Sequence, residues 1–97
     1  MPKFALYGSF KAKPGKEADV EAFLQQAVEL ARKETATVSW YAIREAPGQY
    51  GIFDTFEDEA GRQAHLEGEI AKQLMARADE LFAAPPAIHK IDVLAAR

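Results

Sequence analysis

The order of two kinds of apolar spacing is the feature that most constrains the fold of this chain. Four runs show the alternation typical of strands, at residues 3–12, 38–45, from 50 into the mid-fifties, and 88–95. Three runs show the three- and four-residue spacing typical of helices, at residues 16–34, 60–66 and 69–83. The resulting order is strand, helix, strand, strand, helix, strand, with the last two helical runs forming one connection.

This order predicts a ferredoxin-like split βαβ fold of the α+β class, in which one four-stranded antiparallel sheet carries its helices on a single face. A chain of 97 residues is long enough for one such domain, so residues 1–97 are expected to form a single unit. Strands one to three are apolar on both faces, including Tyr7, Tyr41 and Ile43. Because helices cover only one face, we expect the open faces of two copies to meet in a homodimer.

Local signals support the boundaries of these elements. Pro14-Gly15 ends the first strand, and Pro47-Gly48 marks a hairpin between the second and third. In the helical run that follows Pro14-Gly15, Phe23 is expected on the buried stripe and Glu21 on the exposed side.

Composition excludes several classes of function. The net charge of −3, with scattered Lys and Arg, offers no basic surface for nucleic acid. The absence of cysteine excludes disulfides, thiolate metal sites and cysteine nucleophiles. No apolar run approaches the roughly 20 residues that span a bilayer, and no signal peptide is evident at Met1, so we expect a cytoplasmic protein without a membrane partner.

The stretch from Tyr50 to Leu66 contains the strongest candidate for chemistry. Its first half places Asp54 on a strand, and its second half is a helix opened by Asp58 that carries His65. An acid on a sheet and a histidine on the next helix could together present an oriented base to a cleft, which makes Asp54 and His65 candidate catalytic residues. The alternative is a solvated strand acid and a histidine at the edge of the core.

The sequence gives no sign of a cofactor. No glycine-rich nucleotide motif is present, and His65 and His89 are too far apart for a metal-ligand spacing. We therefore expect neither metal nor cofactor. Aromatic residues crowd the central hairpin, and Trp40, Tyr41 and Phe56 are the candidate substrate-binding residues of an apolar pocket. Their alternative role is packing in the core.

The run Phe53-Asp54-Thr55-Phe56-Glu57-Asp58-Glu59-Ala60, with Ala64-His65-Leu66 on the following helix, resembles the antibiotic biosynthesis monooxygenase family, in particular its quinol monooxygenase-like branch. The resemblance covers nearly the whole chain. It implies a dimeric α/β barrel whose enzymes oxidise quinol- or anthrone-like aromatics with O2 and without metal, flavin or haem. Asp54, Phe56 and His65 fall on the positions of an acid, an aromatic and a histidine that this branch often shows.

Residues used by other members of that family are replaced in this chain. At the positions that the anthrone oxygenases use stand Ile52, Phe56 and Arg62, and at those of the haem-degrading relatives stand Gly8, His65 and Met75. The resemblance therefore implies a cofactor-free oxidoreductase, with His65 as base and Asp54 as its orienting partner, that acts on a small aromatic or apolar metabolite. An isomerase or tautomerase, and a non-catalytic dimeric module that binds a small molecule, are the alternatives.

Overall fold

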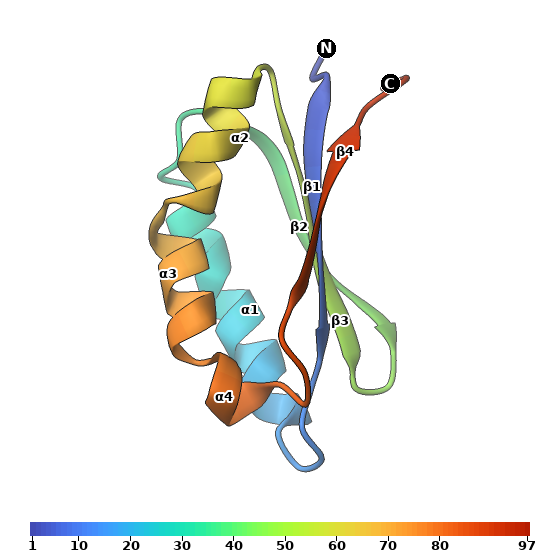
Figure 1. Cartoon of the computed structure of the whole chain (residues 1–97), viewed down its shortest axis with the longest axis vertical. Helices are drawn as coiled ribbons and strands as arrows, with labels where there is room; N and C mark the ends of the chain where they lie inside the picture. Colours follow the sequence, from blue (N-terminus) through green and yellow to red (C-terminus); the bar gives the residue numbers. More distant parts are fainter.

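The computed structural model describes residues 1–97 and has the predicted α+β architecture. Its elements are, in chain order, β1 (Phe4–Lys11), α1 (Glu17–Ala31), β2 (Thr37–Ala46), β3 (Gln49–Phe56), α2 (Glu59–Leu66), α3 (Glu69–Ala76), α4 (Ala78–Leu81) and β4 (Ala87–Asp92). The sheet order is β2-β3-β1-β4, and every neighbouring pair is antiparallel. All four helices lie on one side of the sheet (Figure 1), which confirms the ferredoxin-like fold.

The core lies between the sheet and the helix layer. Alternation along β1 and β3 turns one set of side chains toward the helices, where they meet the apolar stripe of α1 and the end of the helical run before β4. The main buried cluster comprises Phe10, Ala12, Val20, Phe23, Leu24, Tyr50, Ile52, Leu74, Leu81 and Phe82. Phe23 is buried on α1 as the spacing predicted.

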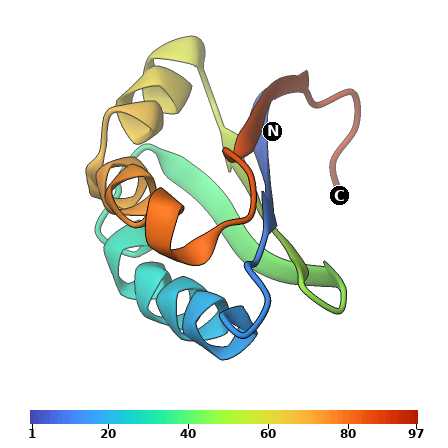
Figure 2. The same ribbon diagram turned by 60° about the horizontal axis from the view of Figure 1, so that its bottom comes forward.

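The face of the sheet turned away from the helices is bare, as the end-on view in Figure 2 shows. The cross-strand register places Tyr7, Phe53 and Tyr41 in one row on this face, with Ile43 beside them. Tyr41 is 59% exposed. The predicted pattern of a sheet apolar on both faces is therefore present, while the homodimer and its barrel remain predictions.

Two helical runs differ from the sequence expectation. The run predicted over 69–83 divides at Arg77, whose φ of −104° and ψ of 3° leave the helical region, so α3 and α4 are separate helices. The guanidinium of Arg77 lies 5.7 Å from the centre of the Phe23 ring and pairs with Glu80, and the break turns Leu81 and Phe82 into the core. The helix predicted over 16–34 ends at Ala31.

Glu21 also differs from the expectation in its contacts. It lies on the side of α1 that was predicted to be exposed, with 37% of its side chain accessible, but its carboxylate also accepts a 2.6 Å hydrogen bond from the Tyr50 hydroxyl and a 2.9 Å bond from Arg44. The fully buried Tyr50 needs a partner for its hydroxyl, and α1 supplies it. No helix has both the length and the apolar character required to cross a bilayer.

Candidate functional site

Asp54 lies at the centre of the sheet on the side that faces the helices. Its Cα is the register partner of Leu6 on β1 and of Trp40 on β2, so strands flank it on both sides. Only 1% of its surface is exposed. A carboxylate is seldom buried to this extent without a partner of opposite charge, and the partner comes from α2.

The start of α2 is capped by Asp58, and Arg62 holds the helix against the sheet. At its start the Asp58 carboxylate accepts a 2.8 Å hydrogen bond from the Gly61 amide, which caps the helix as predicted. One turn later, Arg62 places its guanidinium 5.0 Å from the centre of the Phe4 ring and donates to the Ala5 and Ile91 carbonyls, each at 3.3 Å. His65 follows three residues after Arg62, on the same face of the helix.

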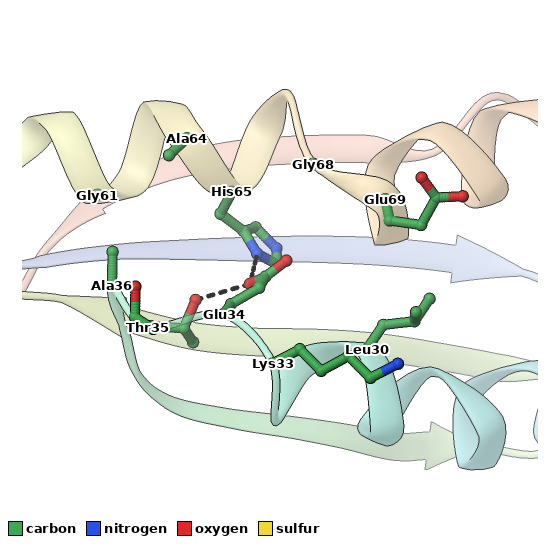
Figure 3. Close-up of a pocket in the computed structure, with 11 residues that line it drawn as sticks. Leu30, Lys33, Glu34, Thr35, Ala36, Gly61, Ala64, His65, Gly68 and Glu69 are labelled. Atoms are coloured by element: carbon green, nitrogen blue, oxygen red, sulfur yellow. Dashed lines mark hydrogen bonds and ion pairs between the residues drawn. The ribbon is translucent and has the colours of Figure 1, made fainter.

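His65 is enclosed between two carboxylates. Its Nε2 lies 2.8 Å from Oδ2 of Asp54, and its Nδ1 lies 2.7 Å from Oε1 of Glu34. Figure 3 shows the Glu34 carboxylate beside the His65 ring. The Thr37 hydroxyl donates a 2.7 Å bond to the same Glu34 oxygen. The Phe56 ring, with its centre 5.4 Å from that of the imidazole, packs against His65. Both ring nitrogens are thus engaged, one on each side.

The surroundings of Asp54 and His65 raise the pKa of both side chains. Burial raises the pKa of the Asp54 carboxyl above its ordinary value, although the neighbouring His65 opposes this. For His65, burial alone would lower the pKa, but the contacts and negative charges of Asp54 and Glu34 outweigh it and raise the pKa to about 8. At neutral pH this favours an imidazolium shared between two acids.

Asp54 borders a small cavity inside the domain, here called the inner cavity. It has a volume of about 50 Å³, and its walls come from β1, β3, α2, α3 and β4. Most of these walls are apolar, with Leu6, Ile70, Leu74 and Ile88 among them. Neither oxygen of Asp54 receives a well-aligned hydrogen bond from the protein, so the contact with His65 is an ion pair. The carboxylate therefore keeps acceptor capacity toward the inner cavity.

A second hollow, the outer pocket, lies on the other side of His65 and opens to solvent. It has a volume of about 510 Å³ and lies between α2 and the turn that follows α1. Glu34, Lys33 and Glu69 line it (Figure 3), together with Thr37. Most of its walls are polar or small, in contrast to the inner cavity.

Two of the three aromatic residues proposed for substrate binding, Trp40 and Tyr41, line a different hollow from those that the Asp54–His65 pair borders. Trp40 and Tyr41 line a third hollow of about 470 Å³ between α1 and β2, which neither Asp54 nor His65 borders. Phe56 is fully buried against the ring of His65 and borders none of the three hollows. Of the five candidates, the fold brings together Asp54, His65 and Phe56.

Glu34 is the member of the site that the sequence analysis did not single out. It lies in the turn beyond α1 and is 31 positions from His65, so neither helical nor strand spacing connects the two. No group of three or more His, Cys, Asp or Glu side chains is arranged to hold a metal ion. Asp54 and Glu34 approach opposite nitrogens of one ring and do not converge on a common point.

A family model described as antibiotic biosynthesis monooxygenase matches residues 4–77, which include β1 to α3 and every residue of the site. Among curated proteins, none matches the chain.

Solved structures match over nearly the full length. The chain is 49% identical to NE2512, a protein of unknown function from Nitrosomonas europaea, with a TM-score of 0.98 over 100% of this chain and 94% of that chain. It shares the fold of Rv0793 from Mycobacterium tuberculosis, at 19% identity and a TM-score of 0.85 over 97% of each chain. It also shares the fold of a candidate antibiotic biosynthesis monooxygenase from Deinococcus radiodurans, at 16% identity and a TM-score of 0.84, covering 97% of this chain and 95% of that one.

Proposed function

The chain belongs to the antibiotic biosynthesis monooxygenase family, and from this membership we propose that it is a cofactor-independent monooxygenase that oxidises a quinol- or anthrone-like aromatic with O2. Within the family we assign it to the quinol monooxygenase-like branch, on the strength of Asp54, Phe56 and His65. The observation that carries the proposal is the buried Asp54–His65 ion pair, 2.8 Å apart, at the wall of an apolar cavity.

The proposed chemistry begins with deprotonation of a substrate hydroxyl. The proton passes to Asp54, whose oxygens retain acceptor capacity, while the imidazolium of His65 stabilises the resulting negative charge. This reverses the roles expected from the sequence, in which His65 was the base and Asp54 its orienting partner. What supports the reversal is that both nitrogens of His65 are already engaged.

The remaining steps belong to the substrate and O2. The deprotonated aromatic passes one electron to O2, and the two radicals combine to form a carbon–oxygen bond. The peroxide takes back the proton held by Asp54, and the hydroperoxide then loses water as its carbon loses hydrogen and its O–O bond breaks. One oxygen atom ends in a quinone and the other in water. The protein supplies a proton acceptor, a fixed cation and a site from which bulk water is excluded.

Access to this site requires side chains to move. The inner cavity, at about 50 Å³, is well below the roughly 150 Å³ of a protein cavity that accepts benzene. Ile88, on the edge strand β4 and 45% exposed, forms one wall, and Ile70, Ala71 and Leu74 of α3 form another. We propose that an aromatic substrate enters between β4 and α3 by displacing these side chains.

A second candidate is an isomerase or tautomerase that acts on a small polar metabolite. The observation that favours it is the outer pocket, which is about ten times larger than the inner cavity, more polar, and bordered by the same histidine. Such an enzyme would move a proton within its substrate and would consume no O2.

O2 uptake with a panel of hydroquinones and dihydroanthracenes tests the proposal. We expect uptake that matches quinone formation, and we expect it to fall on the order of 10²–10⁴-fold in Asp54→Asn. Glu29→Gln, which removes an exposed carboxylate of α1 that borders neither the inner cavity nor the outer pocket, should keep the wild-type rate. Turnover without O2 uptake would replace the oxygenase with the isomerase, and binding without turnover would leave a small-molecule-binding module.

A further inference from the structure

His65 is the only residue that borders both the inner cavity and the outer pocket. Its Nε2 faces Asp54 on the inner side, and its Nδ1 faces Glu34 on the outer side. The proposed chemistry uses the inner contact alone. The outer contact therefore needs its own explanation, since it belongs to a carboxylate from a different part of the chain.

The surroundings of Glu34 are built to hold its side chain in place. Its carboxylate accepts from the Thr37 hydroxyl at 2.7 Å through the oxygen that also contacts His65. Its other oxygen faces Gly68, between α2 and α3, where a Cβ added to the glycine would lie 3.3 Å from that oxygen. The side chain is only 20% exposed although its backbone lies in a surface turn. The contacts with Thr37 and His65, together with this partial enclosure, leave the carboxylate little freedom to turn away from the ring.

We propose that Glu34 is the positioning residue of His65: it holds the imidazole by Nδ1 from the solvent side and so keeps Nε2 directed at Asp54 in the inner cavity. The expected effect of Glu34 on turnover rests on the proposed function. The expected effect of Glu34 on the orientation and charge of His65 does not. Glu34 touches no reacting atom in this arrangement. It acts through the ring, as an acid does that orients a histidine in other sites.

No other charged group competes for the ring. On β3 the neighbours of His65 are Asp54 and the Phe56 ring. The α3 wall of the inner cavity is apolar, and β1 and β4 contribute Leu6, Gly8, Phe10 and Ile88 there. Lys33 and Glu69 also border the outer pocket, but their side chains extend away from the imidazole (Figure 3). The charge state of His65 therefore depends on Asp54 and Glu34.

Two kinds of substitution separate the contributions of Glu34. Glu34→Gln removes the negative charge and leaves an oxygen that can still accept from Nδ1. Glu34→Ala removes both the charge and the acceptor. Thr37→Val keeps Glu34 but deletes the hydroxyl that holds it. Glu29→Gln is the matched control, because it removes a carboxylate from the preceding turns of α1 that contacts only Arg32.

The test is a titration of the His65 ring nitrogens by nitrogen-15 NMR in the intact protein without substrate. In the wild type, Nδ1 should stay protonated throughout and the titration midpoint should lie near pH 8. Glu34→Gln should lower the midpoint by about one pH unit or more, since one of two adjacent negative charges is lost. Thr37→Val should lower it less, and Glu29→Gln should leave it unchanged.

The outcomes distinguish this inference from the proposed function. An unchanged midpoint in Glu34→Gln would overturn the inference, and so would an unprotonated Nδ1 in the neutral ring of the wild type. The second measurement needs no variant, so it tests the inference even where Glu34→Gln fails to fold. A lowered midpoint supports it whether or not O2 is consumed. Where O2 is consumed, kcat in Glu34→Gln should fall about tenfold with little change in KM, and its pH profile should follow the new midpoint.

Discussion

At the scale of single residues, the site depends on an imidazole held between two acids of unequal burial. Asp54 is almost completely enclosed, while Glu34 is partly open to solvent, and His65 lies between them. Removing one partner of such a pair leaves the other buried and uncompensated, so single substitutions at Asp54 and His65 should have related effects.

The first prediction concerns the coupling of this pair in turnover. His65→Gln and Asp54→Asn should each lower kcat/KM on the order of 10²–10⁴-fold, because either change removes the unit that accepts and stabilises the proton. The double variant should be little worse than the more damaging single variant, since residues that act as one unit are not additive. If the fold-loss in kcat/KM of the double variant equals the product of the two single fold-losses, the residues act separately.

The second prediction concerns stability as a function of pH. The pKa of His65 rises from an ordinary 6.5 to about 8 on folding, so its protonated form stabilises the fold fully below about pH 6.5, and this contribution is lost as the pH rises through 8. Urea unfolding should show a decrease on the order of 1–2 kcal/mol between pH 6 and pH 9. The decrease should disappear in His65→Gln and persist in His89→Gln, a histidine on the exposed face of β4.

The sequence pointed to Asp54 and His65 but not to Glu34. Asp54 and His65 could be found because they lie 11 residues apart in one strand–helix unit, where a local pattern and a family resemblance both point to them. Glu34 could not be found, since its contact depends on where a surface turn meets α2. The placement of Trp40 and Tyr41 in a separate hollow likewise depends on how α1 lies against β2.

At the scale of elements, the short helix α2 determines where the imidazole lies. Its eight residues are too few to form a stable helix alone. The helix therefore depends on the Asp58 cap and on the contacts of Arg62 with β1 and β4.

The third prediction follows from the cap. Asp58→Ala should cost about 1 kcal/mol of unfolding free energy, because the Gly61 amide loses its acceptor at the start of α2. Chemical denaturation measures this cost. Glu57→Ala, which removes an exposed carboxylate of the adjacent residue, is the control and should stay within about 0.5 kcal/mol of the wild type. Equal losses in the two variants would mean that the cap does not hold α2.

The fourth prediction concerns α1, which contributes Val20, Phe23 and Leu24 to the main buried cluster. Phe23 is buried in the core and in contact with Arg77, so Phe23→Ala should cost about 3–5 kcal/mol in the same denaturation experiment. Gln26→Ala, on the exposed side of α1, should change stability by no more than about 0.5 kcal/mol. A small loss in Phe23→Ala would place the buried stripe elsewhere.

Apolar spacing predicted the existence and order of the elements better than their detailed contacts. No glycine or proline signals the break at Arg77, and its neighbours Ala76 and Ala78 both favour helix. Glu21 has the spacing of a surface residue, and only the hydroxyl of Tyr50 across the core reveals its partner. Both differences arise from tertiary contacts that act over long sequence separations.

At the scale of the whole molecule, the fifth prediction is the homodimer. The row of Tyr7, Tyr41, Phe53 and Ile43 on the bare face should be buried in an interface of roughly 1,200 Å² or more in total. Sedimentation at micromolar concentration should give twice the 10.7 kDa mass of one chain. Tyr41→Glu should shift the protein toward monomer, whereas Met75→Glu, at a residue of similar exposure on the helical side, should not. A monomeric wild type would contradict the prediction.

The central claim is that the assembled protein transfers an oxygen atom from O2 to an aromatic substrate with its own side chains alone. Turnover under ¹⁸O2, after treatment with a chelator and followed by mass spectrometry of the quinone, tests it most directly. We expect one ¹⁸O atom in each product molecule, the other in water, and an unchanged rate after chelation. An unlabelled product, or activity that is lost with the chelated metal, would contradict it.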